Sequence, residues 1–271
     1  NAKGEPMTEQ FTYLSFGAGV QSTALLLMSD RGLGGVPRAD VAIFADTKAE
    51  PAYVYEHLEA MRGLVSIPIE VVSAGDLGAD SVGGTFMRLP AFTPTDDGRG
   101  GMIRRQCTNE YKIVPIQRWV RQHLGYAKGQ RVKHRVRCLV GISVDEIQRA
   151  KPSQDKWIER LHPLIDADMR RRDCLALLER HGWPIPKKSS CVFCPFHDDA
   201  LWRDLRDNYP AEFAKAVEFD RAFRNSTKAG VKQPVYLHRS LRPLDEVEFK
   251  PAHTTPLFDS FTEECEGMCG V

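Results

Sequence analysis

The sequence of 271 residues lacks an apolar run of the roughly 20 residues that a membrane-spanning helix requires. No signal-peptide pattern is visible near its beginning either, so we expect a cytoplasmic protein without a membrane partner. Neither sign of charge is in excess, because 37 Lys and Arg face 36 Asp and Glu. A global electrostatic field therefore does not draw the chain to nucleic acid or lipid. Local basic stretches such as residues 128–137 are typical of solvated faces.

The seven cysteines are not needed as cross-links, because a chain of this length buries roughly 70–75% of its unfolded surface. In a reducing cytosol, thiols more often serve metal binding or redox chemistry. Cys138 lies in a strand-like apolar pattern and Cys174 in a helical one, and we expect both to be core thiols. The other five lie in polar or turn-rich surroundings that suggest a chemical role: Cys107, Cys191, Cys194, Cys265 and Cys269.

Apolar runs alternate with helical patterns along the first half of the chain. The runs predict buried strands at 11–16, 41–46, 69–73 and 136–142, and the helical periodicity falls at about 21–31, 52–62 and 109–124. This alternation indicates βαβ units, so we predict an α/β fold with a doubly wound parallel sheet. Ligands bind such sheets at the carboxyl ends of the strands. Three polar strand ends should meet there, namely the loop after the first strand, Asp46-Thr47 and Gly141–Ser143.

The organisation changes toward the C-terminus, where the strand pattern stops after Pro195. We predict a tag or disordered N-terminus at 1–10, an α/β nucleotide-binding domain at 11–195 and a helical appendage with a cysteine-containing tail at 196–271. Helices of the appendage are expected at about 198–207 and 210–225. Residues 74–106 are rich in glycine and carry little periodicity, which is typical of a functional lid or a disordered segment.

The first strand runs into a Gly/Ser loop that opens a helix. Gly17 and Gly19 can adopt positive φ, and the N–H groups and positive dipole end of the helix face the same point, an arrangement that suits phosphate. Ser15, Ser22 and Thr23 add hydroxyl donors. The loop is not a Walker A motif, because Gln21 stands where that motif has its Lys. A tight strand-to-helix turn without a ligand is the alternative.

Cys191 and Cys194 form a C-x-x-C turn that Pro195 closes. One interpretation is a thioredoxin-like redox pair. A structural zinc site is a second, although Cys191, Cys194 and His197 supply only three local ligands of the four required. An iron–sulfur cluster is a third, because it can draw thiolates from distant parts of a chain. Two idle cysteines in a turn are the fourth.

Cys107 favours the cluster. It precedes a helix and is flanked by Arg104, Arg105 and Lys112, so its pKa should be lowered and its thiolate available. If the fold brings it to Cys191 and Cys194, the three thiolates would hold a 4Fe-4S cluster and leave one iron open for a substrate or an exogenous sulfur.

Together these motifs resemble the PP-loop adenine nucleotide α-hydrolase superfamily and, within it, the phosphoadenosine phosphosulfate (PAPS) reductase family. The resemblance covers roughly residues 11–195 and the last few residues. It is carried by Ser15–Ser22, Ala45–Pro51, Cys107–Pro115, Gly141–Arg149, Pro163–Asp166 with Asp173, and Cys191–Cys194. It implies a bound adenine nucleotide, ATP or adenylyl sulfate, with Mg²⁺. The implied binding residues are Ser15, Gly17, Gly19, Gln21, Ser22, Thr23, Asp46, Gly141 and Arg149. For Asp46, a helix cap is the alternative role.

The chain departs from the family pattern at three positions. Gln21 replaces the acidic residue of the loop, and Ser143 stands where an Arg is usual. Cys107 is alone where the cluster-bearing reductases have adjacent cysteines, which favours an open three-thiolate cluster as in the thiolation enzymes of the superfamily. The ending Glu264–Val271 instead resembles the Glu-Cys-Gly tail of the reductases, whose cysteine is the mobile nucleophile.

Three functions follow. The leading hypothesis is an ATP pyrophosphatase that adenylates an acceptor and transfers sulfur, with Lys112 neutralising anionic groups and sulfur carried on an open iron or on Cys265 or Cys269. The second is a sulfonucleotide reductase in which a tail cysteine attacks adenylyl sulfate and a thioredoxin-like protein is the reductant. The third is a non-catalytic module, stabilised by Zn²⁺, that contacts nucleic acid through residues 128–137. For the first, the acceptor stays open among a tRNA base, a DNA phosphate and a small metabolite.

Overall fold

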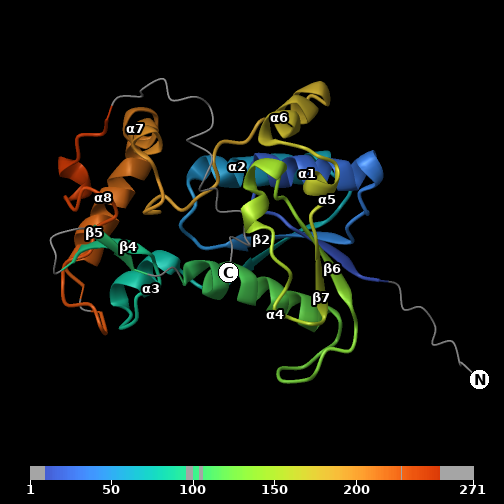
Figure 1. Ribbon diagram of the computed structural model, residues 1–271, viewed down its shortest axis with the longest axis horizontal. Coiled ribbons are helices and arrows are strands. Elements are labelled where there is room, and N and C mark those ends of the chain that lie inside the picture. Colours follow the sequence, from blue (N-terminus) through green and yellow to red (C-terminus); the bar gives the residue numbers. More distant parts are fainter. Residues whose placement is uncertain (1–9, 96–99, 104–105, 227, 251–271) are drawn as a thin grey trace, which may run out of the picture.

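The computed structural model describes residues 10–95, 100–103, 106–226 and 228–250. Its centre is a parallel sheet in the order β3-β2-β1-β6-β7 (Figure 1). The strands are β1 (Thr12–Ser15), β2 (Val41–Asp46), β3 (Ile69–Ser73), β6 (Val136–Val140) and β7 (Ile158–Leu161). The predicted α/β class is therefore confirmed, and four of these strands lie where the apolar runs predicted them. The strand β7 was missed, because its sequence Ile-Glu-Arg-Leu carries charge at an edge of the sheet.

Helices cover both faces of the sheet (Figure 1). Along β1 and β2, side chains alternate between two cores: Leu14 and Phe44 pack with the helices of one face, whereas Tyr13 and Ile43 pack with α4 on the other. The first face carries α1 (Val20–Arg31), α2 (Ala52–Leu64), α5 (Pro163–Asp166) and α6 (Arg171–Arg180), and the second carries α4 (Val114–His123). This is the doubly wound arrangement that the sequence predicts.

The order of the strands fixes where a ligand site belongs. The chain moves from β1 outward through β2 to β3, then crosses the sheet to β6 on the other side of β1. The carboxyl ends of β1 and β6 thus flank the point at which the winding reverses, the usual location of a ligand crevice in such sheets. Ser15 pairs in register with Val140, so the loops that follow these two residues leave the sheet side by side.

Residues 74–106 do not form the structureless segment that we expected. They contain α3 (Leu77–Gly83), which Asp76 caps by accepting a hydrogen bond from the N–H of Ala79, and an antiparallel hairpin of β4 (Ala91–Pro94) and β5 (Gly100–Ile103). The hairpin extends to a partner from far along the chain, because Phe92 bridges to Tyr236. Such non-local pairing leaves no periodic signal in the segment itself.

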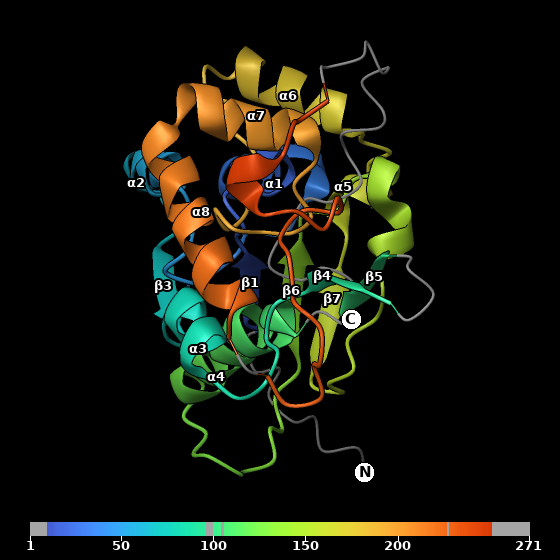
Figure 2. The same cartoon turned by 90° about the vertical axis from the view of Figure 1, so that its left-hand side faces the viewer.

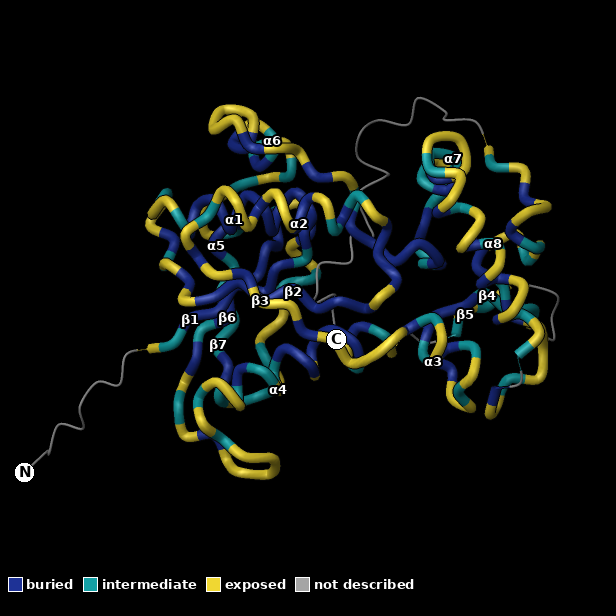
Figure 3. Tube along the Cα trace, turned by 180° about the vertical axis from the view of Figure 1, so that it is seen from behind, coloured by how far each residue is buried: buried dark blue, intermediate teal, exposed yellow. Residues whose placement is uncertain are grey.

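The appendage helices lie close to their predicted ranges, with α7 at Asp199–Asn208 and α8 at Pro210–Arg224. Their core, which holds Trp202 and Phe223 with no exposed surface, also includes Leu77 of α3 and Phe193 of the C-x-x-C turn. In Figure 2, α8 stands beside α3, and Figure 3 shows the buried inner sides of both helices of the appendage. The division of the chain at residue 195 stays a prediction.

Four short helical segments complete the described fold. One of them forms the first turns of the predicted 109–124 helix, as a π-helix that continues into α4. The segments are η1 (Leu33–Gly35), the π-helix η2 (Thr108–Ile113), η3 (Val144–Arg149) and η4 (Leu244–Glu246). Across the ranges that the structure describes, no helix is both long enough and apolar enough to cross a bilayer.

Candidate functional site

The loop after β1 turns sharply into α1, but not at the residues that we expected to supply the strained backbone. Positive φ falls on Ala18, at 57°, whereas Gly19 has φ −95° and is the N-cap. The hydroxyl of Ser22 accepts a hydrogen bond from the N–H of Gly19 at 3.1 Å, which closes the turn. The first N–H groups of α1 have no partner within the helix, as at every helix start, and they emerge at the reversal point of the sheet.

The second hydroxyl of this turn points away from the loop. Thr23 Oγ1 lies 3.0 Å from Nε2 of His57 on α2, and both side chains are buried. Burial lowers the pKa of His57 to about 4, so its ring is neutral at pH 7. The contact couples the start of α1 to α2.

Gln21 belongs to a buried polar network with the segment after β6. Its amide nitrogen donates to Glu146 at 3.2 Å, and its oxygen accepts from Arg171 at 2.9 Å. Arg149 is ion-paired with the same Glu146. The positions Gln21 and Arg149, predicted to bind the nucleotide, are thus brought together at the crevice. Glu146 and Arg171 were not among the predicted site residues, although Glu146 lies within the matched Gly141–Arg149 segment.

The loop after β6 leaves the sheet beside the loop after β1, at the position where such sheets bind ligands. Gly141 and Ser143 are buried next to the end of β1, where Ser15 is also buried. The hydroxyl of Ser143 has no hydrogen-bond partner among the described residues and no exposed surface. A buried hydroxyl without a partner is costly in the free protein, and a ligand oxygen in this crevice would satisfy it.

Asp46, at the end of β2, is held as a carboxylate. It accepts hydrogen bonds at 2.8 Å from the N–H of Lys48 and from the hydroxyl of Tyr55, and the Lys48 ammonium lies at 2.7 Å. Burial by itself would raise the pKa of Asp46, but the bonds from Lys48 and Tyr55 outweigh it and lower the pKa below its ordinary value. Asp46 does not cap α2, whose N-cap is Pro51, so the helix-cap alternative is wrong.

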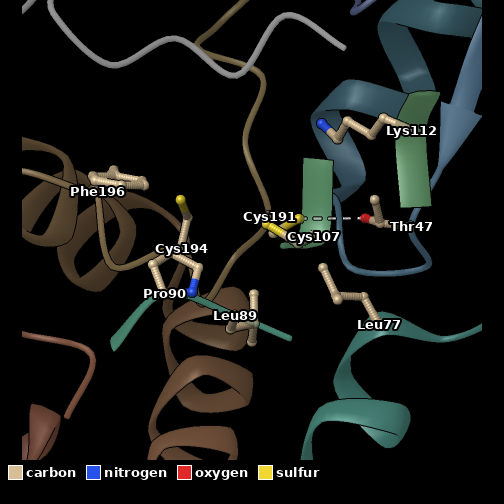
Figure 4. A pocket seen from close by; sticks show the side chains of 9 residues that line it. All are labelled: Thr47, Leu77, Leu89, Pro90, Cys107, Lys112, Cys191, Cys194 and Phe196. Atoms are coloured by element: carbon tan, nitrogen blue, oxygen red, sulfur yellow. Dashed lines mark hydrogen bonds between the residues drawn. The ribbon is translucent and has the colours of Figure 1, made fainter. Parts of the chain in front are cut away.

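Three cysteines line one small cavity beside this strand end (Figure 4). Cys107 precedes the π-helix, and Cys191 and Cys194 come from the C-x-x-C turn, so residues more than eighty positions apart in sequence share the cavity. The cavity has a volume of about 20 Å³. The remaining lining residues are Thr47, Leu77, Leu89, Pro90, Lys112 and Phe196. Cys138 and Cys174 are buried core thiols, as predicted, and burial raises the pKa of Cys138 to about 11.

A set of polar contacts attaches Cys191 to the end of β2. The Cys191 sulfur lies 3.3 Å from Oγ1 of Thr47 and 3.8 Å from Oε1 of Glu50. Glu50 in turn forms an ion pair with Lys112, whose Nζ lies 3.4 Å from Oε1 of Glu50, and both of these side chains are buried. The N–H of Val192 donates to the carbonyl of Ala49 at 2.8 Å and fixes the turn on the same loop. Glu50 was not predicted as a site residue, although it lies in the matched Ala45–Pro51 segment.

The donor set suits an iron–sulfur cluster better than zinc. Three thiols are present, whereas His197, the local candidate for a further zinc ligand, does not line the cavity and bonds to Ser190 Oγ at 2.8 Å. Burial, and then the charge of Lys188, hold the pKa of His197 well below its ordinary value. No group of three His, Cys, Asp or Glu in metal-binding geometry occurs among the described residues. A space of about 20 Å³ admits one water, so its walls would have to separate to accept a cluster.

Some predicted site residues fall outside the described residues. These are the tail cysteines Cys265 and Cys269, and Arg104 and Arg105, which were expected to lower the pKa of Cys107. Lys112, the third cation of that expectation, is ion-paired with Glu50.

No family model and no curated protein sequence matches the chain. Among solved structures, it is similar to phosphoadenylyl-sulfate (PAPS) reductase from Candida auris in its phosphate complex, with TM-score 0.43 and 14% identity over 67% of this chain and 76% of that one. It is also similar to the U34-tRNA thiolase NcsA from Methanococcus maripaludis with its 4Fe-4S cluster, with TM-score 0.40 and 12% identity over 80% of this chain and 73% of that one. The chain resembles both in fold. At these values the likeness carries no argument about the reaction, which has to come from the site.

Proposed function

We propose that this protein is an adenine-nucleotide enzyme that uses ATP to activate an oxygen of an acceptor and then replaces that oxygen with sulfur. The observation that carries the proposal is the 3.3 Å contact between Thr47 Oγ1 and the Cys191 sulfur. It links the carboxyl end of β2 to the C-x-x-C turn across 144 positions of sequence. Three thiols are therefore held at the edge of the sheet where a nucleotide would bind.

The phosphate end of the site is the crevice between the loops after β1 and β6. The N–H groups at the start of α1 would donate hydrogen bonds to the triphosphate. Each well-placed donor stabilises the charge that develops in the transition state by about 3–4 kcal/mol. Arg171 and Arg149 border the crevice through Gln21 and Glu146. Asp46, held as a carboxylate, is the candidate for contact with Mg²⁺ or with the nucleotide.

The reaction balances without a redox partner. The acceptor oxygen attacks the α-phosphorus of ATP, the bond to the bridging oxygen breaks, and pyrophosphate leaves. A hydrosulfide equivalent then attacks the activated carbon or phosphorus of the acceptor, and AMP leaves with the original acceptor oxygen. Positioning and charge neutralisation are the main requirements for such transfers, which agrees with a site built from loop N–H groups and cations.

Cys107, Cys191 and Cys194 are the residues that would hold a 4Fe-4S cluster, which when bound supplies an iron able to coordinate sulfur. Leu77, Leu89 and Phe196 supply apolar walls around the thiols, and Thr47 contacts the Cys191 sulfur. Lys112 lines the same cavity, and its ammonium, paired with Glu50, is the cation that would contact an anionic sulfur species or the leaving phosphate there.

The test is product formation by protein that has been reconstituted anaerobically. With ATP, sulfide and a panel of RNA, DNA and small-molecule acceptors, we expect AMP and pyrophosphate in equal amounts together with a thiolated acceptor. Cys191→Ser should still form AMP but transfer no sulfur. Complete absence of AMP and pyrophosphate with every acceptor would overturn the proposal.

The sequence of the tail favours a second candidate, a sulfonucleotide reductase. Here the thiolate of Cys265 or Cys269 attacks the sulfur of adenylyl sulfate, the adenylate leaves, and an S-sulfocysteine forms. A dithiol protein of the thioredoxin type then releases sulfite and becomes a disulfide. Sulfite release without ATP, lost in Cys269→Ser or Cys265→Ser, would support this candidate, and sulfite release unchanged in both variants would exclude it.

A further inference from the structure

The charges of the chain are unevenly distributed, although their sum is close to zero. Between Glu110 and Asp145 there is no acidic residue, while the same stretch holds eight basic ones. These are Lys112, Arg118, Arg121, Lys128, Arg131, Lys133, Arg135 and Arg137. Lys112 belongs to the cysteine site, and most of the others lie on the second half of α4 and on the loop that joins it to β6.

This basic stretch forms two adjoining grooves, which we call the basic surface. The first, of about 690 Å³, lies between α4 and the loop and is lined by Arg118, Arg121 and Lys128 together with three glutamines and Tyr126. The second, of about 430 Å³, is lined by Arg121, Arg131, Lys133, Arg135 and Lys156 together with His134 and Trp157. Arg121 lines both grooves, so they adjoin at this residue.

The loop that carries these charges is held in shape. Tyr126 Oη accepts hydrogen bonds from the N–H groups of Lys133 at 3.0 Å and His134 at 3.3 Å, and it lies 2.6 Å from Nδ1 of the His134 ring. The Arg121 guanidinium donates to the carbonyls of Ala127 and Gln130. A preorganised loop loses little conformational entropy when it binds a partner.

The charged ends nevertheless remain in solvent. Lys128, Arg131, Lys133 and Arg135 are all exposed, and Figure 3 shows the loop before β6 as an exposed projection from the body. Asp155, the acidic residue among those that line the grooves, is engaged by the Gln117 amide at 2.7 Å. Seven Lys and Arg side chains line the two grooves against the one carboxylate of Asp155, so the field of the surface stays positive.

We propose that the basic surface binds a nucleic acid through its phosphodiester backbone. A membrane presents a flat array of headgroups, which does not match two concave grooves in series. The glutamines of the first groove and the rings of Tyr126 and Trp157 add hydrogen-bonding and stacking groups that suit sugars and bases. The proposal is independent of the proposed reaction, since no residue that lines the two grooves also lines the cysteine cavity.

Fluorescence anisotropy with labelled RNA and DNA oligonucleotides of the same sequence, single- and double-stranded, tests this surface. We expect the logarithm of the association constant to fall linearly with the logarithm of the salt concentration between about 50 and about 200 mM. In the triple variant Lys128→Gln, Arg131→Gln, Lys133→Gln the affinity should fall roughly tenfold or more, and the salt slope should shrink by about 0.7–0.9 for each lost phosphate contact. The arms of the experiment tell RNA from DNA.

The matched control removes three exposed charges elsewhere, with Arg180→Gln, Lys232→Gln and Arg239→Gln. It should keep the affinity and the salt slope of the original protein. Equal binding by the loop variant and the original protein would overturn the proposal, as would equal losses in the loop variant and the control. Tighter binding to anionic lipid vesicles than to every oligonucleotide would also overturn it. Thermal unfolding of both variants verifies that they are folded.

Discussion

Lys112 and Glu50 form an ion pair inside the protein, with the ammonium nitrogen 3.4 Å from a carboxylate oxygen and both side chains nearly inaccessible to water. The pair joins the π-helix before α4 to the loop after β2, and it lies beside the Cys191 sulfur. A buried pair of this kind adds little net stability compared with an apolar pair, but either charge is costly when left alone. A buried ion pair next to three thiols therefore fits a role in the site.

The first prediction concerns this ion pair. Lys112→Met leaves the Glu50 carboxylate with one cation fewer in the interior, so we expect a loss of about 3–5 kcal/mol in the free energy of unfolding. The double variant Lys112→Met, Glu50→Gln should recover a large part of that loss, because no charge is left buried. Urea unfolding of the original protein, Lys112→Met, Glu50→Gln and the double variant measures the coupling between the two side chains. Additive losses in the double variant would contradict a direct interaction.

The strands and helices around the crevice were predictable because each carries its own signal. Buried apolar runs predict β1, β2, β3 and β6, and the glycine loop with the start of α1 follows one of them directly. The meeting of Ser15 with Gly141 then follows from the rule for parallel sheets. The region at 74–106 was not predictable in the same way, since Phe92 pairs with Tyr236 and the Lys228 ammonium bonds to the carbonyls of Val82 and Gly84.

The site residues that the sequence analysis did not assign share a cause. Glu50 and Glu146 are single carboxylates whose role depends on what the fold brings to them, namely Lys112 and Cys191 for one and Gln21 and Arg149 for the other. Neither spacing nor composition marks such contacts. In the Gly loop, residue identity was misleading for a local reason, because the positive φ falls on Ala18 and not on Gly19.

The second prediction concerns acid stability. The pKa of His57 is lowered by burial from about 6.5 in the unfolded chain to about 4 in the folded protein, so the unfolded state binds a proton first as the pH falls. The free energy of unfolding should therefore decrease from pH 6.5 down to pH 4, by about 1.4 kcal/mol per pH unit for this group. Urea unfolding at several pH values gives the slope of the free energy of unfolding against pH. In His57→Gln this slope should be smaller, by the amount that corresponds to one bound proton. An unchanged slope would mean that His57 titrates normally.

The third prediction tests the polar network at the crevice. Gln21→Leu keeps the approximate shape of the side chain, but Glu146 loses the hydrogen bond that it accepts from Gln21 and Arg171 loses the one that it donates to Gln21. We expect a loss of about 1–3 kcal/mol in the free energy of unfolding and weaker ATP binding, because both partners are then less well fixed. Thr95→Val, at an exposed residue that follows β4 of the separate two-stranded sheet, serves as a control for ATP binding by calorimetry. Full ATP affinity in Gln21→Leu would show that the network has no role in shaping the nucleotide site.

The fourth prediction links the appendage to the cysteines. Phe193, within the C-x-x-C turn, stacks on Phe219 of α8 with ring centroids 3.9 Å apart. Removing the Phe219 ring leaves a cavity under the turn, so Phe219→Ala should cost about 3–5 kcal/mol and should increase the rate at which Cys191 and Cys194 react with a thiol reagent. Phe213→Ala, on the same helix but half-buried and packed against Phe249, is the matched control. It should cost less and leave the thiol rates nearly unchanged. Equal rates of thiol reaction in the two variants would show that the appendage does not influence the cysteines. The Phe193–Phe219 stack would then contribute to packing alone.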